Sequence, residues 1–264
     1  MSAPDEIVLR LNGVSVFDQA RKQLTPAIDL SVPAATVVAV VGPNASLVRK
    51  FLRVMAAVDR AAQGTLELFG DADPLRGRVH YKQLRSRLGY MIGESSLLPI
   101  YNGLINVMLP ALYHQRSRSF KHVSRDARAL LDELGCSFDT QILPHAMSRF
   151  QQSLIELARV LMLAPEILYI EEPFSHLTTD DRRLFSEKLM AVRDRIHSKC
   201  IIMSTDYLGF IRQHADQVLF VDGACVEVFN HWEAFSSSRI PPVAQYLGRE
   251  SVDATDPATA IPGF

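Results

Sequence analysis

Two stretches near the N-terminus alternate apolar and polar residues before the pattern becomes continuously apolar. They read EIVLRLNGVSVF at 6–17 and AIDLSVPAATVVAVVG at 27–42. Alternation is typical of half-exposed antiparallel strands, whereas a continuous apolar run is typical of a strand that is buried on both faces. The pattern therefore predicts antiparallel strands that lead into a buried parallel strand at 37–41.

The apolar spacing changes to a helical period after this strand, which predicts a helix over 46–59. A further strand is expected at 64–70, and the chain from about 93 to 162 has a mostly helical pattern. Further apolar segments predict two buried strands and a hairpin, at 166–173, 198–205 and 215–229. Strands that alternate with helices predict an α/β fold with a parallel sheet, in which the helical stretch is an inserted subdomain.

Local signals predict how two segments begin and end. In SRDARALLDELG, Ser124 is expected to cap the start of a helix and Gly135 to end it. The residues after Pro241-Pro242 are rich in turn formers. We expect this last segment to run extended over a surface.

Composition narrows the function classes. The 264 residues carry a net charge of −1 and 22% charged residues, so we expect no broad nucleic-acid-binding surface. Three cysteines, Cys136, Cys200 and Cys225, are too scattered for a disulfide framework or a zinc site. We expect no signal peptide, and no apolar run approaches the ~20 residues that cross a bilayer. Any role at a membrane is therefore expected to depend on a partner.

The segment VVGPNASLVRK at 40–50 joins the buried strand to the predicted helix through a glycine-containing turn. Strand, turn and helix N-terminus together form the setting in which backbone N–H groups bind phosphate. The segment nevertheless lacks most of the side chains that such a loop uses.

The most specific stretch is PHAMSRFQQSLIELARVLMLAPEILYIEEPF at 144–174. It resembles the nucleotide-binding subunits of ABC transporters, which have Leu-Ser-Gly-Gly-Gln, an alanine-arginine pair, a proline, four apolar residues and Asp-Glu-Pro in this order. Here Ser148 opens the motif, Ala158-Arg159 follow, and Glu171 comes 23 residues after Ser148. The resemblance covers about residues 7–235.

The resemblance implies an α/β fold with a P-loop (RecA-like) parallel core, an N-terminal antiparallel β subdomain and an inserted helical subdomain. The nucleotide-binding domain would span 1–239, with the helical subdomain at about 93–162. Residues 240–264 would form a C-terminal tail that packs on a neighbouring subunit.

The phosphate loop implied by the resemblance departs from the family pattern. Its positions are Gly42, Asn44, Ala45, Ser46, Leu47, Val48 and Arg49. Ala45 and Leu47 replace glycines, and we expect the Leu47 side chain to fill phosphate space. Val48 stands at the lysine position and Arg49 at the position of the magnesium-binding hydroxyl. Lys50 lies two residues late, on another side of the helix.

The implied signature that faces a partner's γ-phosphate is Ser148, Arg149, Phe150 and Gln151. Its two glycines are replaced by Arg149 and Phe150. Ser148 and Gln151 match, but Ser-x-x-Gln is also an ordinary capping box at a helix start.

The sensor positions implied by the resemblance are replaced as well. Gly93 stands where a glutamine binds magnesium, and Thr178 stands at the D-loop aspartate. The switch histidine position holds Thr205 or Asp206, depending on register. His176 and His214 lie near in sequence but not in register, so neither is expected to be catalytic.

Two carboxylates remain where the family has its catalytic acids. Glu171 stands at the magnesium-holding position and Glu172 at the general-base position. Either Glu172 supports residual catalysis, or it ties together loops at a subunit interface. We prefer the second interpretation because the lysine, the hydroxyl and the sensors are replaced.

These departures favour a pseudo-ATPase that acts as a structural or regulatory subunit of a membrane transporter. We expect no cofactor and no metal site, with ATP and magnesium only if residual binding persists. A weakly active ATPase and a soluble regulator off the membrane are the alternatives.

EEPF, LINVMLPAL and the C-terminal tail further resemble the Mla-type ATPases of Mce-family lipid transport, which implies a lipid cargo. A similar stretch, SSLLPIYNGLINVMLP, also resembles lipoprotein-release and macrolide-exporter ATPases. The implied partners are a membrane permease and a second ABC ATPase chain, either the same chain or an intact paralogue. The implied location is cytoplasmic, on the inner face of the membrane, with no nucleic acid bound.

Overall fold

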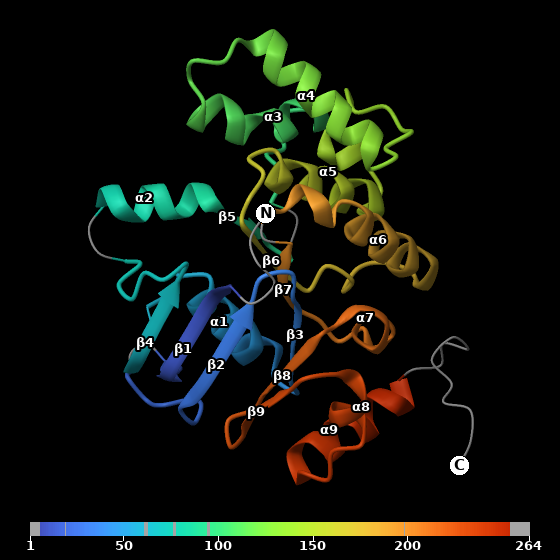
Figure 1. Cartoon of the computed structure of the whole chain (residues 1–264). Helices are drawn as coiled ribbons and strands as arrows, with labels where there is room; N and C mark the ends of the chain where they lie inside the picture. Colours follow the sequence, from blue (N-terminus) through green and yellow to red (C-terminus); the bar gives the residue numbers. More distant parts are fainter. Residues whose placement is uncertain are drawn as a thin grey trace.

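The strands form two sheets in the computed structural model, which describes residues 6–18, 20–60, 63–75, 78–93, 96–197 and 199–253. A three-stranded antiparallel sheet has the order β2-β1-β4, and a six-stranded sheet has the order β5-β6-β7-β3-β8-β9. Figure 1 shows the antiparallel sheet beside the larger sheet, which runs through the middle of the molecule. The strands are β1 Ile7–Ser15, β2 Ile28–Pro33, β3 Val37–Val41, β4 Gln63–Leu68, β5 Leu88–Met91, β6 Ile167–Glu171, β7 Cys200–Ser204, β8 Gln217–Val221 and β9 Val226–Phe229.

The strand β3 is the centre of the larger sheet, since it pairs in parallel with both β7 and β8. All five of its residues are buried, as are those of β6 and β7. A strand that is covered on both faces needs apolar side chains on both, which explains the continuous runs in the sequence. The predicted buried strands and the β8–β9 hairpin are confirmed.

Helices cover the sheet and build a separate layer above it. The helices α3, α4 and α5 lie together at one end of the molecule (Figure 1). A hydrophobic cluster that includes Val107, Leu130 and Ile155 holds them together. The helices are α1 Ala45–Met55, α2 Arg78–Arg87, α3 Gly103–His114, α4 Phe120–Glu133, α5 Arg149–Leu161, α6 Thr179–Ala191, α7 Leu208–His214, α8 Trp232–Ser236 and α9 Pro241–Asp253, with short 3₁₀ helices η1 Pro144–Ala146 and η2 Arg193–Arg195.

The start of α4 differs from the prediction. The helix begins one turn earlier, where Ser119 is the N-cap and its hydroxyl oxygen accepts from the His122 N–H. Ser124 lies inside the helix because Val123 and Ala127 already continue its buried face. Gly135 follows the helix with a φ of 68°, which confirms the predicted end.

The C-terminal segment also differs from the prediction, because residues 241–253 form the helix α9 rather than an extended tail. Pro241 at the start of the helix has the φ that a first helical turn requires. Val243 and Tyr246 are 0% and 4% exposed, and the Tyr246 ring packs against Phe220 and Phe235 of the same chain. Residues 254–264, the rest of the expected tail, lie outside the described residues.

We predict that the substitution Tyr246→Ala lowers the free energy of unfolding by roughly 3 kcal/mol, because it removes a buried ring from a packed cluster. Denaturant titration followed by circular dichroism measures this change. The matched control is Gln245→Ala, at an exposed position of the same helix, which should cost less than about 0.5 kcal/mol. Equal effects of the two substitutions would show that α9 does not belong to the core.

Candidate functional site

The loop between β3 and α1 has the backbone of a tight strand-to-helix turn. Gly42 is needed there because a Cβ atom would lie 2.0 Å from the backbone oxygen of Val221. Asn44 caps the helix, since its side-chain oxygen accepts from the Leu47 N–H at 3.1 Å. The Ala45 and Ser46 positions are exposed at the first turn of α1. The sequence prediction of a strand, turn and helix at this place is confirmed.

The two apolar side chains of the loop have separate surroundings. Leu47 is 8% exposed and belongs to the core cluster that contains Val40 and Phe51. The expectation that Leu47 fills phosphate space was therefore wrong, because its side chain is drawn into the core. Val48 instead lines the cavity beside the loop, at the lysine position.

Arg49 lies against the two carboxylates that end β6. Its Nε is 3.9 Å from Glu171 Oε2, and its Nη2 is 3.7 Å from Glu172 Oε1. Arg49 Nε is buried and has no hydrogen-bond partner among the described residues. The Glu171 side chain is 3% exposed, so the guanidinium is the cation next to a buried acid.

Tyr90 completes the surroundings of Glu171. Its hydroxyl donates to Glu171 Oε1 at 2.5 Å. Burial raises the pKa of Tyr90, and the hydrogen bond to Glu171 raises the pKa further, so the hydroxyl stays protonated and donates. Glu171 thus has a donor on one oxygen and a cation near the other.

The backbone at Glu172 adopts a φ of 41°, in the left-handed region. Such a conformation costs a residue with a side chain about 1–3 kcal/mol. The Glu172 N–H donates to the backbone oxygen of Ser204 at 3.0 Å and also lies 3.1 Å from the Ser204 hydroxyl oxygen. These contacts tie the end of β6 to the end of β7 and aim Glu172 toward Arg49.

A cavity of about 300 Å³ lies between the loop and the ends of β3 and β7. The two charged side chains on it, Glu172 and Asp206, are both acids. Thr205 is 5% exposed, and its hydroxyl oxygen accepts from the Tyr207 N–H. Asp206 is thus the exposed residue of the two that the sequence offered for the switch position. The cavity is lined by Val41, Gly42, Pro43, Ala45, Val48, Glu172, Ser204, Thr205, Asp206 and Tyr246.

Gly93 cannot carry a longer side chain without a shift of the backbone. A Cβ atom there would lie 2.6 Å from the backbone oxygen of Glu171. The glutamine that the family places at this position would therefore clash with the end of β6. Gly93 and the two carboxylates are next to each other, as the alignment to the family implied.

The signature residues open α5 as a helix cap. Ser148 accepts from the Gln151 N–H, and the Gln151 side chain accepts from the Ser148 N–H, which makes a complete capping box. The ordinary capping interpretation of this pair is confirmed. Arg149 is exposed and Phe150 is half-buried, where it packs against the helical subdomain.

A buried network behind the signature was missed by the sequence prediction. Glu156 is 4% exposed, and one of its carboxylate oxygens accepts from the Ser96 N–H at 2.5 Å. Arg159 donates to the Ser96 backbone oxygen at 2.9 Å. Burial raises the pKa of Glu156, while the Ser96 N–H lowers it. Helical spacing on α5 was the available signal, since Glu156 and Arg159 are three residues apart.

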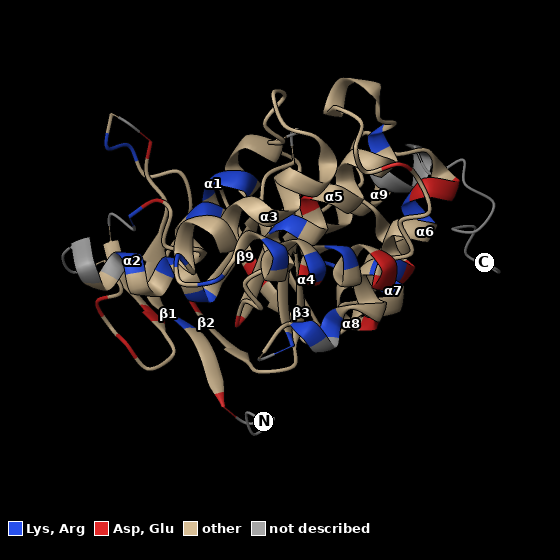
Figure 2. Cartoon of the chain, turned by 90° about the horizontal axis from the view of Figure 1, so that it is seen from above, with Lys and Arg blue, Asp and Glu red and all other residues tan. Residues whose placement is uncertain are grey.

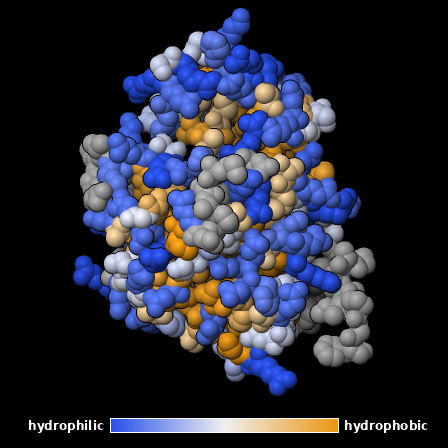
Figure 3. Space-filling model, viewed as in Figure 1, coloured by the Kyte–Doolittle hydropathy of each residue, from blue (hydrophilic) through white to orange (hydrophobic). Residues whose placement is uncertain are grey.

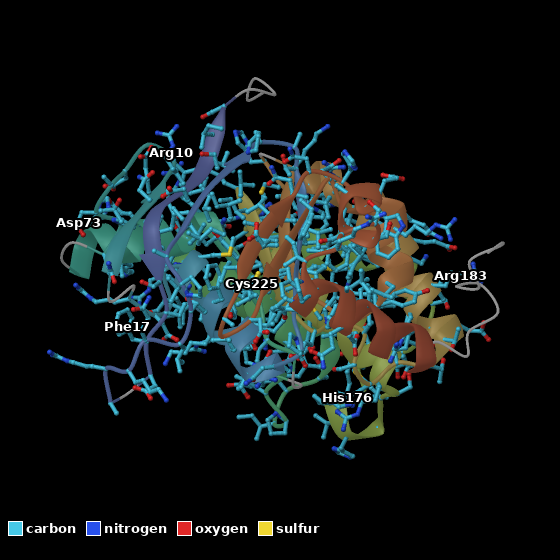
Figure 4. All side chains as sticks on the ribbon, turned by 90° about the horizontal axis from the view of Figure 1, so that it is seen from below. Arg10, Phe17, Asp73, His176, Arg183 and Cys225 are labelled. Carbon is cyan, nitrogen blue, oxygen red and sulfur yellow. The ribbon has the colours of Figure 1, made fainter. Side chains whose placement is uncertain are left out.

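The other candidate residues have structural surroundings. Thr178 caps α6. His176, which Figure 4 shows at the edge of the molecule, lines a small cavity with Arg149 and Glu156. His214 packs on Phe210, and burial lowers the pKa of His214. The cysteines are free, and no cluster of metal-ligating side chains occurs among the described residues.

A family model described as "ABC transporter" matches residues 26–175. The chain belongs to the ABC transporter family. It is 28% identical over 244 residues to the glutamate transport ATP-binding protein GluA of Corynebacterium efficiens, covering 92% of this chain and 98% of that protein. It is also 27% identical to the L-cystine import ATP-binding protein TcyC of Bacillus subtilis, covering 86% of this chain and 92% of that protein.

Solved structures of ABC cassettes have the same fold. CbiO1 of Clostridium perfringens, described as part of the transporter complex cbiONQ, gives a TM-score of 0.76 at 15% identity over 94% of each chain. The dimeric bacterial cassette MJ0796 gives 0.73 at 18% identity, covering 84% of this chain and 98% of that chain. The predicted ABC cassette fold is confirmed, and no helix among the described residues is long and apolar enough to cross a membrane.

The ABC family uses ATP and magnesium, and the residues present here do not fit that pair. The lysine position holds the buried Val48, and the hydroxyl position holds a cation that already lies beside both carboxylates. A metal cation placed between Arg49, Glu171 and Glu172 would meet a positive charge in its own ligand sphere.

We predict that Arg49→Met lowers the free energy of unfolding by about 2 kcal/mol at neutral pH, because Glu171 then stays buried without its cation. Urea unfolding monitored by fluorescence measures the change. Lys50→Met is the matched control, since Lys50 is the next residue on α1 and makes no ion pair among the described residues. The control should change stability by less than about 0.5 kcal/mol, and equal losses would contradict the assigned ion pair.

Proposed function

We propose that this ABC cassette is a catalytically degenerate subunit that acts as a structural or regulatory component of a membrane transporter. The observation that carries the proposal is the guanidinium of Arg49, 3.7 Å from Glu172 and 3.9 Å from Glu171. The guanidinium of Arg49 is part of the chain itself, and it lies beside the carboxylates where family members bind a magnesium ion. The two carboxylates then have a cation beside them without a bound metal ion or nucleotide.

Electrostatics supports this proposal. A nucleotide triphosphate brings several negative charges, which the family balances with a lysine and a metal ion. In this chain the cavity beside the loop presents Glu172 and Asp206 instead. Arg49 carries a single charge, so a guanidinium that balances the two carboxylates has no charge left to balance a phosphate.

The signature at the start of α5, which would face a partner's nucleotide, also departs from the family pattern. Arg149 and Phe150 occupy the start of α5, where family members bring small residues close to a partner's nucleotide. We propose that the chain pairs with a second ABC cassette, either the same chain or an intact paralogue. The dimeric MJ0796 structure supports pairing of this fold.

A membrane permease is the second proposed partner. Four apolar side chains are exposed in the loop between β5 and α3, at Ile92, Leu98, Ile100 and Tyr101, and Ile100 is 75% exposed. Exposed apolar residues gathered in one loop mark an interaction site. The proposed location is therefore the cytoplasmic face of a membrane. The alternative, a soluble regulator, does not account for these exposed apolar side chains.

Support for a class of cargo comes from the names of the relatives and not from the residues of the site. The names of GluA and TcyC concern glutamate and cystine. A lipid cargo of the Mla type finds no support among the relatives described above. We propose that the transporter handles an amino acid or a similarly small polar solute.

A weak ATPase is the second candidate, because Glu172 still stands at the general-base position beside the cavity. Stability in Mg-ATP separates the two functions. A ligand at 100 times its dissociation constant stabilises the folded state by about 2.7 kcal/mol. The proposed function predicts no such shift for the natural chain.

We predict that Val48→Lys combined with Arg49→Ser creates thermal stabilisation by Mg-ATP. The pair restores the charge and the hydroxyl while Leu47 stays in the core. Val48→Met with Arg49→Ser is the control, since it has the hydroxyl and a long side chain but no charge, and it should show no shift. A shift of the natural chain as large as that of the restored variant would contradict the proposal.

We predict that Ile100→Glu releases the cassette from its membrane complex, because a charge enters the apolar contact. Size-exclusion chromatography of the detergent-extracted complex measures the bound fraction. Leu143→Glu is the control, at an exposed leucine outside the 92–101 loop. Retention of the Ile100→Glu variant in the complex would rule out this loop as the permease contact.

A further inference from the structure

Positive charge is concentrated in one part of the chain. Residues 78–128 contain nine Lys and Arg but two Asp and Glu, although the whole chain has a net charge of −1. This segment includes α2, α3 and the first nine residues of α4, whose last turn carries Asp132 and Glu133. Figure 2 looks onto that end of the molecule and shows Lys and Arg along α2 and α4.

The helix α4 presents a cationic face to solvent. Lys121, Arg125 and Arg128 are spaced four and three residues apart, so they lie on one face, and all three are exposed. Two acids of this helix lie near them: Asp126 is shared by Arg118 and Arg125, and Asp132 is exposed one turn after Arg128. Hydrogen bonds from Arg118 and Arg125 lower the pKa of Asp126. Lys121 and Arg128 have no carboxylate partner among the described residues.

Tyr113 lies in the last turn of α3, the helix that shares a buried cluster with α4. Tyr113 is 59% exposed, and its ring centroid is 6.0 Å from both Lys82 Nζ and Arg116 Cζ. Within the described part of the chain, neither Lys82 nor Arg116 makes a salt bridge. Tyr113 therefore links the cations of two elements that are far apart in sequence. We call Lys82, Arg116, Lys121, Arg125 and Arg128 the basic rim.

Large apolar side chains are exposed along the basic rim. Phe120 is 58% exposed next to Lys121 at the start of α4, and Tyr113 is 59% exposed beside Lys82 and Arg116. Figure 3 shows hydrophilic residues over the end of the molecule formed by the helical subdomain, with apolar residues exposed just below them. Cations mixed with exposed aromatic and aliphatic side chains are typical of a surface that contacts lipid headgroups.

We propose that the basic rim is a docking surface for anionic phospholipid headgroups. The cations attract the charged membrane surface, and Phe120 and Tyr113 contact its outer layer.

Sedimentation with vesicles that contain no permease tests the proposal. We expect the full chain to bind vesicles with about 30% phosphatidylglycerol but not pure phosphatidylcholine, since each basic residue near an anionic surface adds roughly fivefold. Raising the salt from about 0.1 M to about 1 M should release the chain, because the Debye length falls to about 3 Å. Equal binding to neutral vesicles, or binding that resists salt, would overturn the proposal.

A charge-reversal variant tests whether the residues of the basic rim form the vesicle-binding surface. The variant with Lys82→Glu, Lys121→Glu and Arg128→Glu should lose at least roughly 100-fold in vesicle partitioning, which is the loss expected from removing the three positive charges alone. The matched control reverses Lys22, Arg212 and Arg239, which lie in the β1–β2 connection, in α7 and before α9, and it changes the net charge equally. Binding by the rim variant equal to that of the natural chain, or equal losses in both variants, would contradict the rim. Tighter binding of the natural chain to duplex DNA than to the anionic vesicles would assign the surface to nucleic acid instead.

Discussion

The ion pairs of Arg49 with Glu171 and Glu172 join three parts of the chain. Arg49 belongs to the first helix, Glu171 and Glu172 end a strand more than a hundred residues later, and Tyr90 comes from the strand β5. Glu171 is buried, and a buried carboxylate needs a cation or strong donors. Because α1, β5 and β6 all converge on it, the arrangement of the loops depends on this charge being balanced.

The parallel sheet explains why these groups meet. β3 and β6 are separated by β7 in the same sheet, so the loops that follow their carboxyl ends lie at one edge. Family members use this edge for nucleotide. In this chain Val48 and Gly93 keep the packing of the edge, while Arg49 supplies the positive charge from within. The fold does not require a bound ligand to satisfy Glu171.

Local sequence patterns were enough to predict the strands of the sheet and the positions of the site residues along the chain. Continuous apolar runs marked β3, β6 and β7, and the Ser148–Gln151 spacing marked the start of α5. Two helix boundaries were missed for separate reasons. Both Ser119 and Ser124 are residue types that cap a helix. The burial of Val123 and Ala127 shows that the helix has already begun before Ser124. The helix α9 was missed because turn formers at 248–264 outweighed the apolar spacing of Val243, Tyr246 and Leu247.

The side-chain contacts within the site could not be predicted from the sequence. Spacing along one chain says which element a residue occupies, but it does not say that Tyr90 and Arg49 both reach Glu171. Those contacts depend on side-chain directions across three elements. The same limit applies to Leu47, whose burial depends on how α1 packs in the core.

The measurement that tests the central claim most directly is equilibrium dialysis of the purified chain against radiolabelled ATP at millimolar magnesium. The account predicts no saturable binding, because Arg49 already balances the two carboxylates and Val48 offers no charge to phosphate. Saturable binding that approaches one nucleotide per chain would contradict it.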